Sequence, residues 1–149
     1  MARQRSVGEK PAVARRAVAT GELAVSAATR RRIRAGSVEK GDPFAAGELA
    51  GLLAMKRTPE LIPHCHPVRL TGSGVELRVG PRGVRVRAYA EALDRTGVEM
   101  EALVGASVAL LTVWDMVKYL EKDARGLYPG TSMGPIRVES KTKGGSSPE

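Results

Sequence analysis

The sequence contains little cysteine and few aromatic residues, and these shortages exclude several classes of protein. A single cysteine in 149 residues permits no internal disulfide and no structural zinc site built from several thiolates. Aromatic residues make up 3% of the chain, so platforms on which nucleic-acid bases could stack are scarce. The hydrophobic core must therefore consist mainly of aliphatic side chains and alanine.

Long apolar segments are also missing. The N-terminus has no apolar run of the kind that a secretory signal needs, and no stretch of about 18 consecutive apolar residues occurs. We therefore expect a soluble, cytoplasmic protein that does not enter a membrane. Its length suffices for one compact domain. We predict a flexible basic arm over residues 1–14, a single folded domain over 15–140 and a flexible tail over 141–149.

The positive charge is unevenly distributed. The net charge is +8, and residues 1–40 hold ten Lys or Arg against three Glu. Arg30, Arg31, Arg32 and Arg34 form its densest part. Cations favour the last turn of a helix, so we interpret this cluster first as a solvated helix end. A phosphate-binding patch is the alternative, and it would fit a basic nucleic-acid-binding protein.

The first half of the chain carries two helix signals. A short strand is expected at residues 22–26, and Ser26 is placed to cap a helix that runs toward Gly36. The second signal is stronger, because Asp42 at an N-cap followed by Pro43 is a favoured way to begin a helix. We predict that this helix runs from residue 43 to about residue 57.

The second half of the chain alternates clearly between apolar and polar residues. Residues 75–79 and 84–92 alternate on either side of the turn GPRG, which predicts a β-hairpin with one buried face and one arginine-rich face. A long helix over about 96–122 and a last strand over 135–140 follow. These elements predict an α+β fold, a ferredoxin-like sandwich with an antiparallel sheet and helices packed on one face.

The long helix carries two charged residues on an apolar stripe. At about 100° per residue, five residues share one face: Met100, Val104, Ser107, Val108 and Leu111. Asp115 and Lys118 continue this stripe, so we predict that both project from the inner side of the helix. A surface ion pair within one helix is the simpler interpretation. A buried pair would lose several kcal/mol per ion on desolvation, and a functional role would explain its retention.

Three further charged residues lie close to predicted helix starts. Glu99 has capping-box spacing from Thr96, which is its simplest role. Glu101 points elsewhere, and a cap does not explain it. Lys40, next to Gly41 before the predicted helix, could bind an anion, because free N–H groups and the helix dipole both favour negative charge there.

The stretch LIPHCHPVRL holds the only cysteine and both histidines. If this stretch is extended, His64 and His66 point to one side and Cys65 to the other. Surface or packed histidines are the simplest interpretation. A metal site is a second one, but a catalytic zinc needs a third ligand. Proton transfer or hydrogen bonding to a substrate is the third.

Two segments carry a resemblance to a known family. KGDPFAAGELAGLLAMKRTPELIPHCHP and TGVEMEALVGASVALLTVWDMVKYLEKD resemble the molybdenum-cofactor biosynthesis protein C family, the cyclic pyranopterin monophosphate synthases, and the likeness covers roughly residues 7–145. It implies a ferredoxin-like subunit in a homohexamer, a trimer of dimers, with active sites at subunit interfaces. It also implies a lyase that converts 3′,8-cyclo-7,8-dihydro-GTP to cyclic pyranopterin monophosphate and pyrophosphate.

The resemblance also implies which residues act. The essential residues of the family match Lys40, His66, Glu99, Glu101, Asp115 and Lys118, with Asp115 at the position of the acid/base. The substrate-contacting segments match His64, Cys65, His66, Met100 and Glu101. The partner is then a small nucleotide-derived substrate, and no nucleic acid is expected. No cofactor or protein-bound metal is expected either, although Mg²⁺ could accompany the triphosphate.

Some positions depart from the family. Its residue before the motif cysteine is usually apolar and is His64 here, which weakens the metal interpretation. A lysine usually follows the Gly-Gly of the tail, where this chain has Ser146, and Lys141 or Lys143 could substitute for it. The loop ARGLYPGTSMG is longer than is common. A metallohydrolase that uses the His-x-His pair remains a second alternative function, after the nucleic-acid-binding protein.

Overall fold

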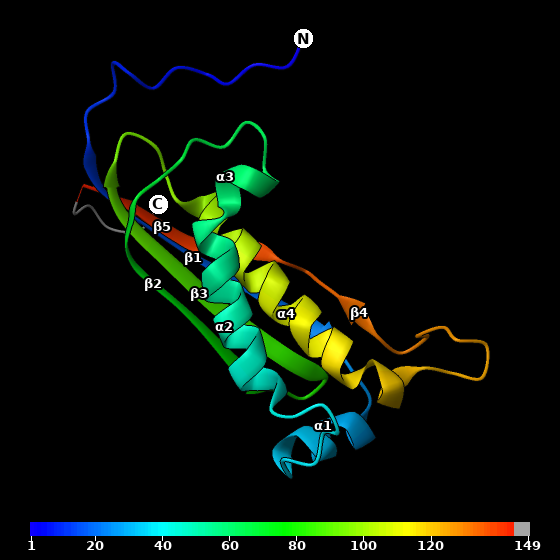
Figure 1. Cartoon of the computed structure of the whole chain (residues 1–149). Helices are drawn as coiled ribbons and strands as arrows, with labels where there is room; N and C mark the ends of the chain where they lie inside the picture. Colours follow the sequence, from blue (N-terminus) through cyan, green and yellow to red (C-terminus); the bar gives the residue numbers. More distant parts are fainter. Residues whose placement is uncertain (145–149) are drawn as a thin grey trace.

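A sheet and a layer of helices make up the part of the chain that the structure describes, residues 1–144 of a computed structural model (Figure 1). The elements follow one another as β1 (Val13–Ala24), α1 (Ala27–Arg34), α2 (Pro43–Lys56), α3 (Thr58–Leu61), β2 (Leu70–Val79), β3 (Gly83–Asp94), α4 (Glu99–Glu121), β4 (Ser132–Met133) and β5 (Arg137–Lys143).

β1 is the central strand of an antiparallel sheet. It pairs with β3 along its whole length, from Val13 opposite Asp94 to Ala24 opposite Gly83. β2 continues the sheet beyond β3, while β4 and β5 pair with the other side of β1. Strand, helix, hairpin, helix and strand in this order form a ferredoxin-like arrangement. The predicted α+β fold with an antiparallel sheet is confirmed.

α2 and α4 lie side by side across one face of the sheet (Figure 1). The core between these layers is aliphatic, as the composition predicts, and β3 buries one residue in two through Val84, Val86, Ala88, Ala90 and Ala92. The intervening side chains, such as those of Arg85 and Arg87, are exposed on the opposite face. The predicted hairpin with one buried and one arginine-rich face is therefore confirmed.

Glycines allow the two long helices to approach closely. A Cβ atom added at Gly51 of α2 would lie 2.8 Å from the carbonyl oxygen of Gly105 in α4. A Cβ atom at Gly105 would lie 2.5 Å from the terminal methyl carbon of Met55. Both distances are shorter than ordinary carbon contacts. A side chain at Gly51 would therefore push the helix backbones apart, whereas one at Gly105 would first displace the Met55 side chain.

The predicted helix starts are confirmed in the first half of the chain. The Ser26 hydroxyl accepts a hydrogen bond from the Thr29 N–H at the start of α1. A carboxylate oxygen of Asp42 accepts from the backbone N–H groups of Phe44 and Ala45 at the start of α2. Each oxygen satisfies donors that the first turn of a helix leaves free.

The capping box predicted for the long helix is wrong. α4 begins at Glu99 with Val98 as its N-cap, and no side chain caps it. Thr96 lies two residues before this N-cap, too early for that role. The Glu99 carboxylate pairs instead with the Lys141 ammonium, at 3.8 Å.

Two strands are longer than expected. β1 begins at Val13 rather than near residue 22, and paired arginines within it hide its alternation. β5 continues through Lys143, into the segment 141–149 that we expected to be a flexible tail. Residues 145–149 lie outside the described part of the chain. The pairing of β5 with β1 explains the extension, because a strand partner is available along the whole edge.

The predicted orientation of the α4 stripe is wrong. Met100 and Leu111 are 41% and 52% exposed, and the side chains of Asp115 and Lys118 are 61% and 44% exposed. α4 instead buries a face of small residues with Ala102, Gly105, Ala106 and Ala109. Close packing against α2 selects small side chains for part of this face, and Leu110, Val113 and Val117 complete it. The stripe of Met100 and Leu111 lies outside the buried face.

By length and composition, α4 is the one described helix that could cross a membrane. This is weak evidence, since the central helix of a soluble core satisfies the same criteria. α4 packs against α2 and against strands β1 and β3, and these contacts explain its apolar composition without a membrane.

Candidate active site

Two lysines and an aspartate meet near the C-terminal half of α4. The Lys118 ammonium lies 3.1 Å from one carboxylate oxygen of Asp115, and the Lys40 ammonium lies 3.6 Å from the other. Lys40 also donates a hydrogen bond to the Asp115 carbonyl oxygen, at 3.2 Å. We call these three residues the lysine–aspartate cluster. It joins the loop before α2 to α4, so residues 75 positions apart in the chain come together.

The charges of this cluster stabilise one another. The hydrogen bond from Lys118, and the charges of Lys118 and Lys40, hold the pKa of Asp115 below its ordinary value. The same hydrogen bond and the carboxylate charge raise the pKa of Lys118. Asp115 is therefore ionised and Lys118 protonated at neutral pH. Two ammonium groups and one carboxylate leave an excess positive charge that can attract an anion.

A second group of candidate residues lies near the N-terminal end of α4. The Glu101 side chain is 1% exposed, and the Cys65 thiol donates to one of its oxygens over 3.6 Å. The other oxygen, Oε2, has no hydrogen-bond partner within residues 1–144. Together with Glu99 and its partner Lys141, these residues form what we call the glutamate–cysteine cluster.

Burial controls the protonation of this second cluster. Loss of solvent is the main cause that raises the pKa of Glu101, with a contribution from the nearby charge of Glu99. Burial and the Glu101 carboxylate raise the pKa of the Cys65 thiol to about 11. The thiol is thus protonated at neutral pH and is a poor nucleophile. Glu101 can hold a proton at a pH where an exposed carboxyl group would have lost it.

The two histidines have different surroundings. α3 ends at Leu61, and residues 62–69 form an irregular connection to β2 rather than a continuous extended strip. His64 is exposed, and its ring nitrogen Nδ1 contacts the Arg3 carbonyl oxygen of the N-terminal arm. His66 is partly buried beside Cys65. Across residues 1–144, no three His, Cys, Asp or Glu side chains lie close enough to hold a metal ion together, so the His-x-His pair lacks a third ligand.

A small polar pocket of about 200 Å³ opens beside the first residues of α4. Arg15, Arg16 and Glu99 line it together with Lys141 and Lys143. No motif in the sequence marks Arg15 or Arg16 as site residues. The register of β1 against β5 places Arg15 opposite Lys143, and a pairing between strands so distant in the chain gives no local signal.

The predicted site residues thus fall into two groups, one toward each end of α4. Fourteen positions separate Glu101 from Asp115 on α4, which corresponds to about 21 Å along the axis at about 1.5 Å per residue. Lys40 and Lys118 accompany Asp115, while Cys65, Glu99 and Glu101 lie at the other end. Met100 lies between Glu99 and Glu101 in the chain and is exposed at that end of the helix. Within a single chain the two groups therefore lie far apart.

Comparisons with known proteins agree on one family. The model of the MoaC family matches residues 4–144. A probable cyclic pyranopterin monophosphate synthase of Methanosarcina acetivorans is 51% identical over 143 residues, which cover 96% of this chain and 90% of that protein. Proteins of the same name are similar in Thermococcus kodakarensis, at 50% identity over 93% of this chain and 88% of the relative, and in Archaeoglobus fulgidus, at 49% over 93% and 89%.

Proposed function

The chain belongs to the MoaC family, and from this membership we infer that it is a cyclic pyranopterin monophosphate synthase, a lyase of molybdenum-cofactor biosynthesis. The family match over residues 4–144 is the observation that carries this conclusion. The resemblance that the sequence analysis identified is therefore confirmed. The lysine–aspartate and glutamate–cysteine clusters contain five of the six residues predicted to be catalytic, and His66 adjoins the second cluster.

We propose that the reaction is the one that the resemblance implies. The substrate is 3′,8-cyclo-7,8-dihydro-GTP, and the products are cyclic pyranopterin monophosphate and pyrophosphate. The rearrangement of the rings requires proton transfers, and closure of the cyclic phosphate requires that the charge of the leaving pyrophosphate be stabilised. The two clusters offer complementary groups for these tasks, since one is cationic and the other contains a carboxyl group that can hold a proton.

We propose that each active site combines the lysine–aspartate cluster of one subunit with the glutamate–cysteine cluster of another. The separation of about 21 Å along α4 supports this arrangement, because it keeps the two clusters of one chain far apart. Two copies of α4 that pack antiparallel about a two-fold axis would bring opposite ends together and form two equivalent sites.

The exposed apolar surface of the helix layer supports this assembly. Leu49 and Leu53 on α2 are 60% and 49% exposed, and Met100 and Leu111 on α4 are similarly uncovered. Exposed apolar side chains that gather on one face mark surfaces where proteins associate. Three such dimers would give the homohexamer that the resemblance implies.

Within the shared site, we assign anion binding and proton donation to the lysine–aspartate cluster. Lys118 is protonated and Asp115 ionised at neutral pH, so Lys118 is suited to donate a proton and Asp115 to hold it in position. Lys40 completes the cationic pair that would bind phosphate or protonate a ring intermediate. This assignment refines the expectation that Asp115 itself is the acid/base.

The glutamate–cysteine cluster would contact the ring amines of the substrate. The unpartnered Oε2 of Glu101 can accept a hydrogen bond from an amine or exchange a proton with it. Cys65 holds the other carboxylate oxygen in place, and Glu99 lies two positions away on the same helix end. His66 would bind the triphosphate or carry a proton. His64 and Met100 would lie at the margin of the site as further contacts.

The function is tested by incubating the purified protein with the cyclised nucleotide and measuring pyrophosphate and the cyclic pterin. Both products should appear in equal amounts. Absence of product under conditions in which the Methanosarcina acetivorans relative forms it would overturn the assignment.

Mixed assemblies test the shared site. Lys118→Ala and Glu101→Gln chains should each be inactive alone, and refolding them together should restore activity. With random pairing, one site in each mixed dimer is intact, so about a quarter of the wild-type rate is expected. A mixture of Lys40→Ala and Lys118→Ala chains is the control, because both changes affect the same cluster and no intact site can form. Equal rates from the two mixtures would exclude the shared arrangement.

We further propose that the enzyme is cytoplasmic and needs no cofactor, with Mg²⁺ as the only expected companion of the triphosphate. The two alternative functions have less support. A metallohydrolase lacks a third ligand beside the histidine pair within the described residues. A nucleic-acid-binding protein would have to use the basic residues of the arm and α1, and its binding would weaken steeply with salt.

A further inference from the structure

An open groove of about 800 Å³ crosses the sheet on the face opposite α2 and α4. Residues of β1, β2, β3 and β5 and of the turns beside them line it. We call it the arginine groove after the five arginines in its lining: Arg78, Arg82, Arg85, Arg87 and Arg137. Three glutamates also line it: Glu22, Glu76 and Glu139. The groove therefore carries an excess of positive charge.

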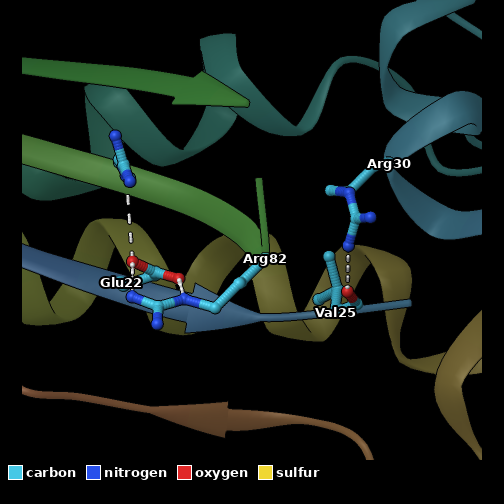
Figure 2. A network of polar contacts seen from close by, with 5 residues as sticks. Glu22, Val25, Arg30 and Arg82 are labelled. Carbon is cyan, nitrogen blue, oxygen red and sulfur yellow. Dashed lines mark hydrogen bonds and ion pairs between the residues drawn. The ribbon is translucent and has the colours of Figure 1, made fainter. Parts of the chain in front are cut away.

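Glu22 holds two of these arginines in place. Its side chain is 17% exposed and lies 3.2 Å from the Nε atom of Arg82 and 3.8 Å from that of Arg85. Figure 2 shows the Glu22 carboxylate beside the guanidinium group of Arg82, with Arg30 bound nearby to the Val25 carbonyl oxygen. Each guanidinium group has five N–H donors, so pairing with one carboxylate leaves donors free to bind a ligand.

The other arginines of the groove, Arg78, Arg87 and Arg137, are also accessible to an anion. Arg87 pairs with Glu139 at 3.4 Å, and Arg78 pairs with Glu76 at 2.6 Å. Within residues 1–144, Arg137 forms no side-chain ion pair, although its backbone joins the sheet. The paired arginines are all at least half exposed. An anion can therefore reach them without displacing the core.

We propose that the arginine groove binds a short chain of phosphates, of the size of inorganic triphosphate, at a site separate from the two candidate active-site clusters. The lining strands β2, β3, β1 and β5 are consecutive in the sheet, so at about 4.8 Å per strand they span about 14 Å. This width exceeds a single phosphate and suits several linked ones. Guanidinium groups bind phosphate oxygens through paired, charge-assisted hydrogen bonds.

The lining of the groove disfavours larger partners. No exposed large apolar side chain of the described chain lies in it, whereas a protein interface has an apolar or aromatic centre. No aromatic side chain lines it, so the bases of a single-stranded nucleic acid would have no stacking partner. The groove thus recognises phosphate charge rather than a base or an apolar surface. This proposal does not depend on the proposed synthase activity.

Calorimetric titration of the whole protein with inorganic triphosphate at low salt tests the proposal. The Arg85→Gln/Arg137→Gln variant should bind at least about tenfold more weakly, because two charged donors are lost. Arg31→Gln/Arg34→Gln removes the same charge from α1 and should change the affinity less than about twofold. Both comparisons are repeated in Lys118→Ala protein, in which binding to the candidate active site is weakened, and the same loss is expected there.

Several results would overturn the proposal. Absence of triphosphate binding, or equal loss in the α1 variant, would show that the groove is an ordinary solvated sheet face. Loss of synthase turnover in the groove variant would show that the groove belongs to the active site, whereas unchanged turnover with lost binding supports a separate site. An oligonucleotide or oligoglutamate that displaces triphosphate from the groove at lower concentration would assign the groove to a macromolecule.

Discussion

Replacement of Glu101 by glutamine should change how the stability of the protein depends on pH. Glutamine has nearly the same shape as a protonated glutamate but cannot ionise. Since burial raises the pKa of Glu101 in the folded chain, the folded protein keeps this proton at pH values at which the unfolded chain has lost it. The stabilisation is fully present below the unfolded value of about 4.3 and is lost as the pH rises through the folded value.

The size of this effect follows from the burial of the side chain. Glu101 is 1% exposed, so solvent screening does not reduce the cost of its ionisation. Each unit by which the pKa is raised corresponds to about 1.4 kcal/mol. In a domain of this length, that energy shifts the melting temperature by about 3 to 5 °C. Glu101→Gln should therefore melt at the same temperature as the wild type at pH 4 and higher at pH 8.

Thermal denaturation between pH 4 and pH 8, at one fixed protein concentration, measures this difference. Glu60→Gln removes the same charge from an exposed position in α3 and controls for net charge. Parallel melting curves for the wild type and Glu101→Gln over the whole range would refute the reasoning. That result would mean that a cation, for instance from another subunit, already neutralises the buried carboxylate.

Three further changes have defined outcomes. Gly51→Ala should lower the free energy of unfolding by about 1 to 3 kcal/mol through overpacking. Gly130→Ala is the control and should leave it nearly unchanged, because a Cβ atom there meets no atom within 4 Å. Equal effects of the two changes in thermal denaturation would contradict the close helix contact. Glu121→Gln should destabilise the protein at neutral pH, since three hydroxyl groups and one N–H group donate to this carboxylate. Because those bonds lower its pKa, the difference in stability between Glu121→Gln and the wild type should shrink as the pH falls through the pKa of the folded state. A stability difference independent of pH would contradict this role of the carboxylate. Cys65, with its pKa near 11, should react with iodoacetamide about a hundredfold more slowly at pH 8 than an ordinary thiol. Its rate should rise in Glu101→Gln. Alkylation of the wild type at the ordinary rate would contradict this, because it would show that the thiol is accessible and ionised.

Helical spacing was enough to predict that Asp115 and Lys118 pair, since residues three apart on a helix are neighbours. It was not enough to predict which way the pair faces. The prediction assumed that the larger apolar residues of α4 point to the core. The contact between Gly51 and Gly105 instead puts small side chains on the inner face, because the helices approach closely there, while Met100 and Leu111 are exposed. A pattern of hydrophobicity alone cannot distinguish a core face from a surface that another subunit covers.

The rest of the candidate site depends on contacts between distant segments. Glu101 stood out in the sequence because a helix cap did not explain it, but its burial beside Cys65 arises from a loop 36 positions away. Lys40 reaches Asp115 only because α2 and α4 run antiparallel. Arg15 enters the pocket beside α4 through the register of β1 and β5. Tertiary packing determines each of these positions, and no local pattern encodes them.

The glycine contact between α2 and α4 also affects the distance between two charged groups. Lys40 lies in the segment that enters α2, and Asp115 lies on α4. The separation of the two helices therefore determines how far the ammonium lies from the carboxylate. A graded series at Gly51, from alanine to serine to valine, would widen that gap without altering any charged group. Substrate affinity and the ionisation of Asp115 would then change with side-chain volume at a position that touches neither the substrate nor the ions.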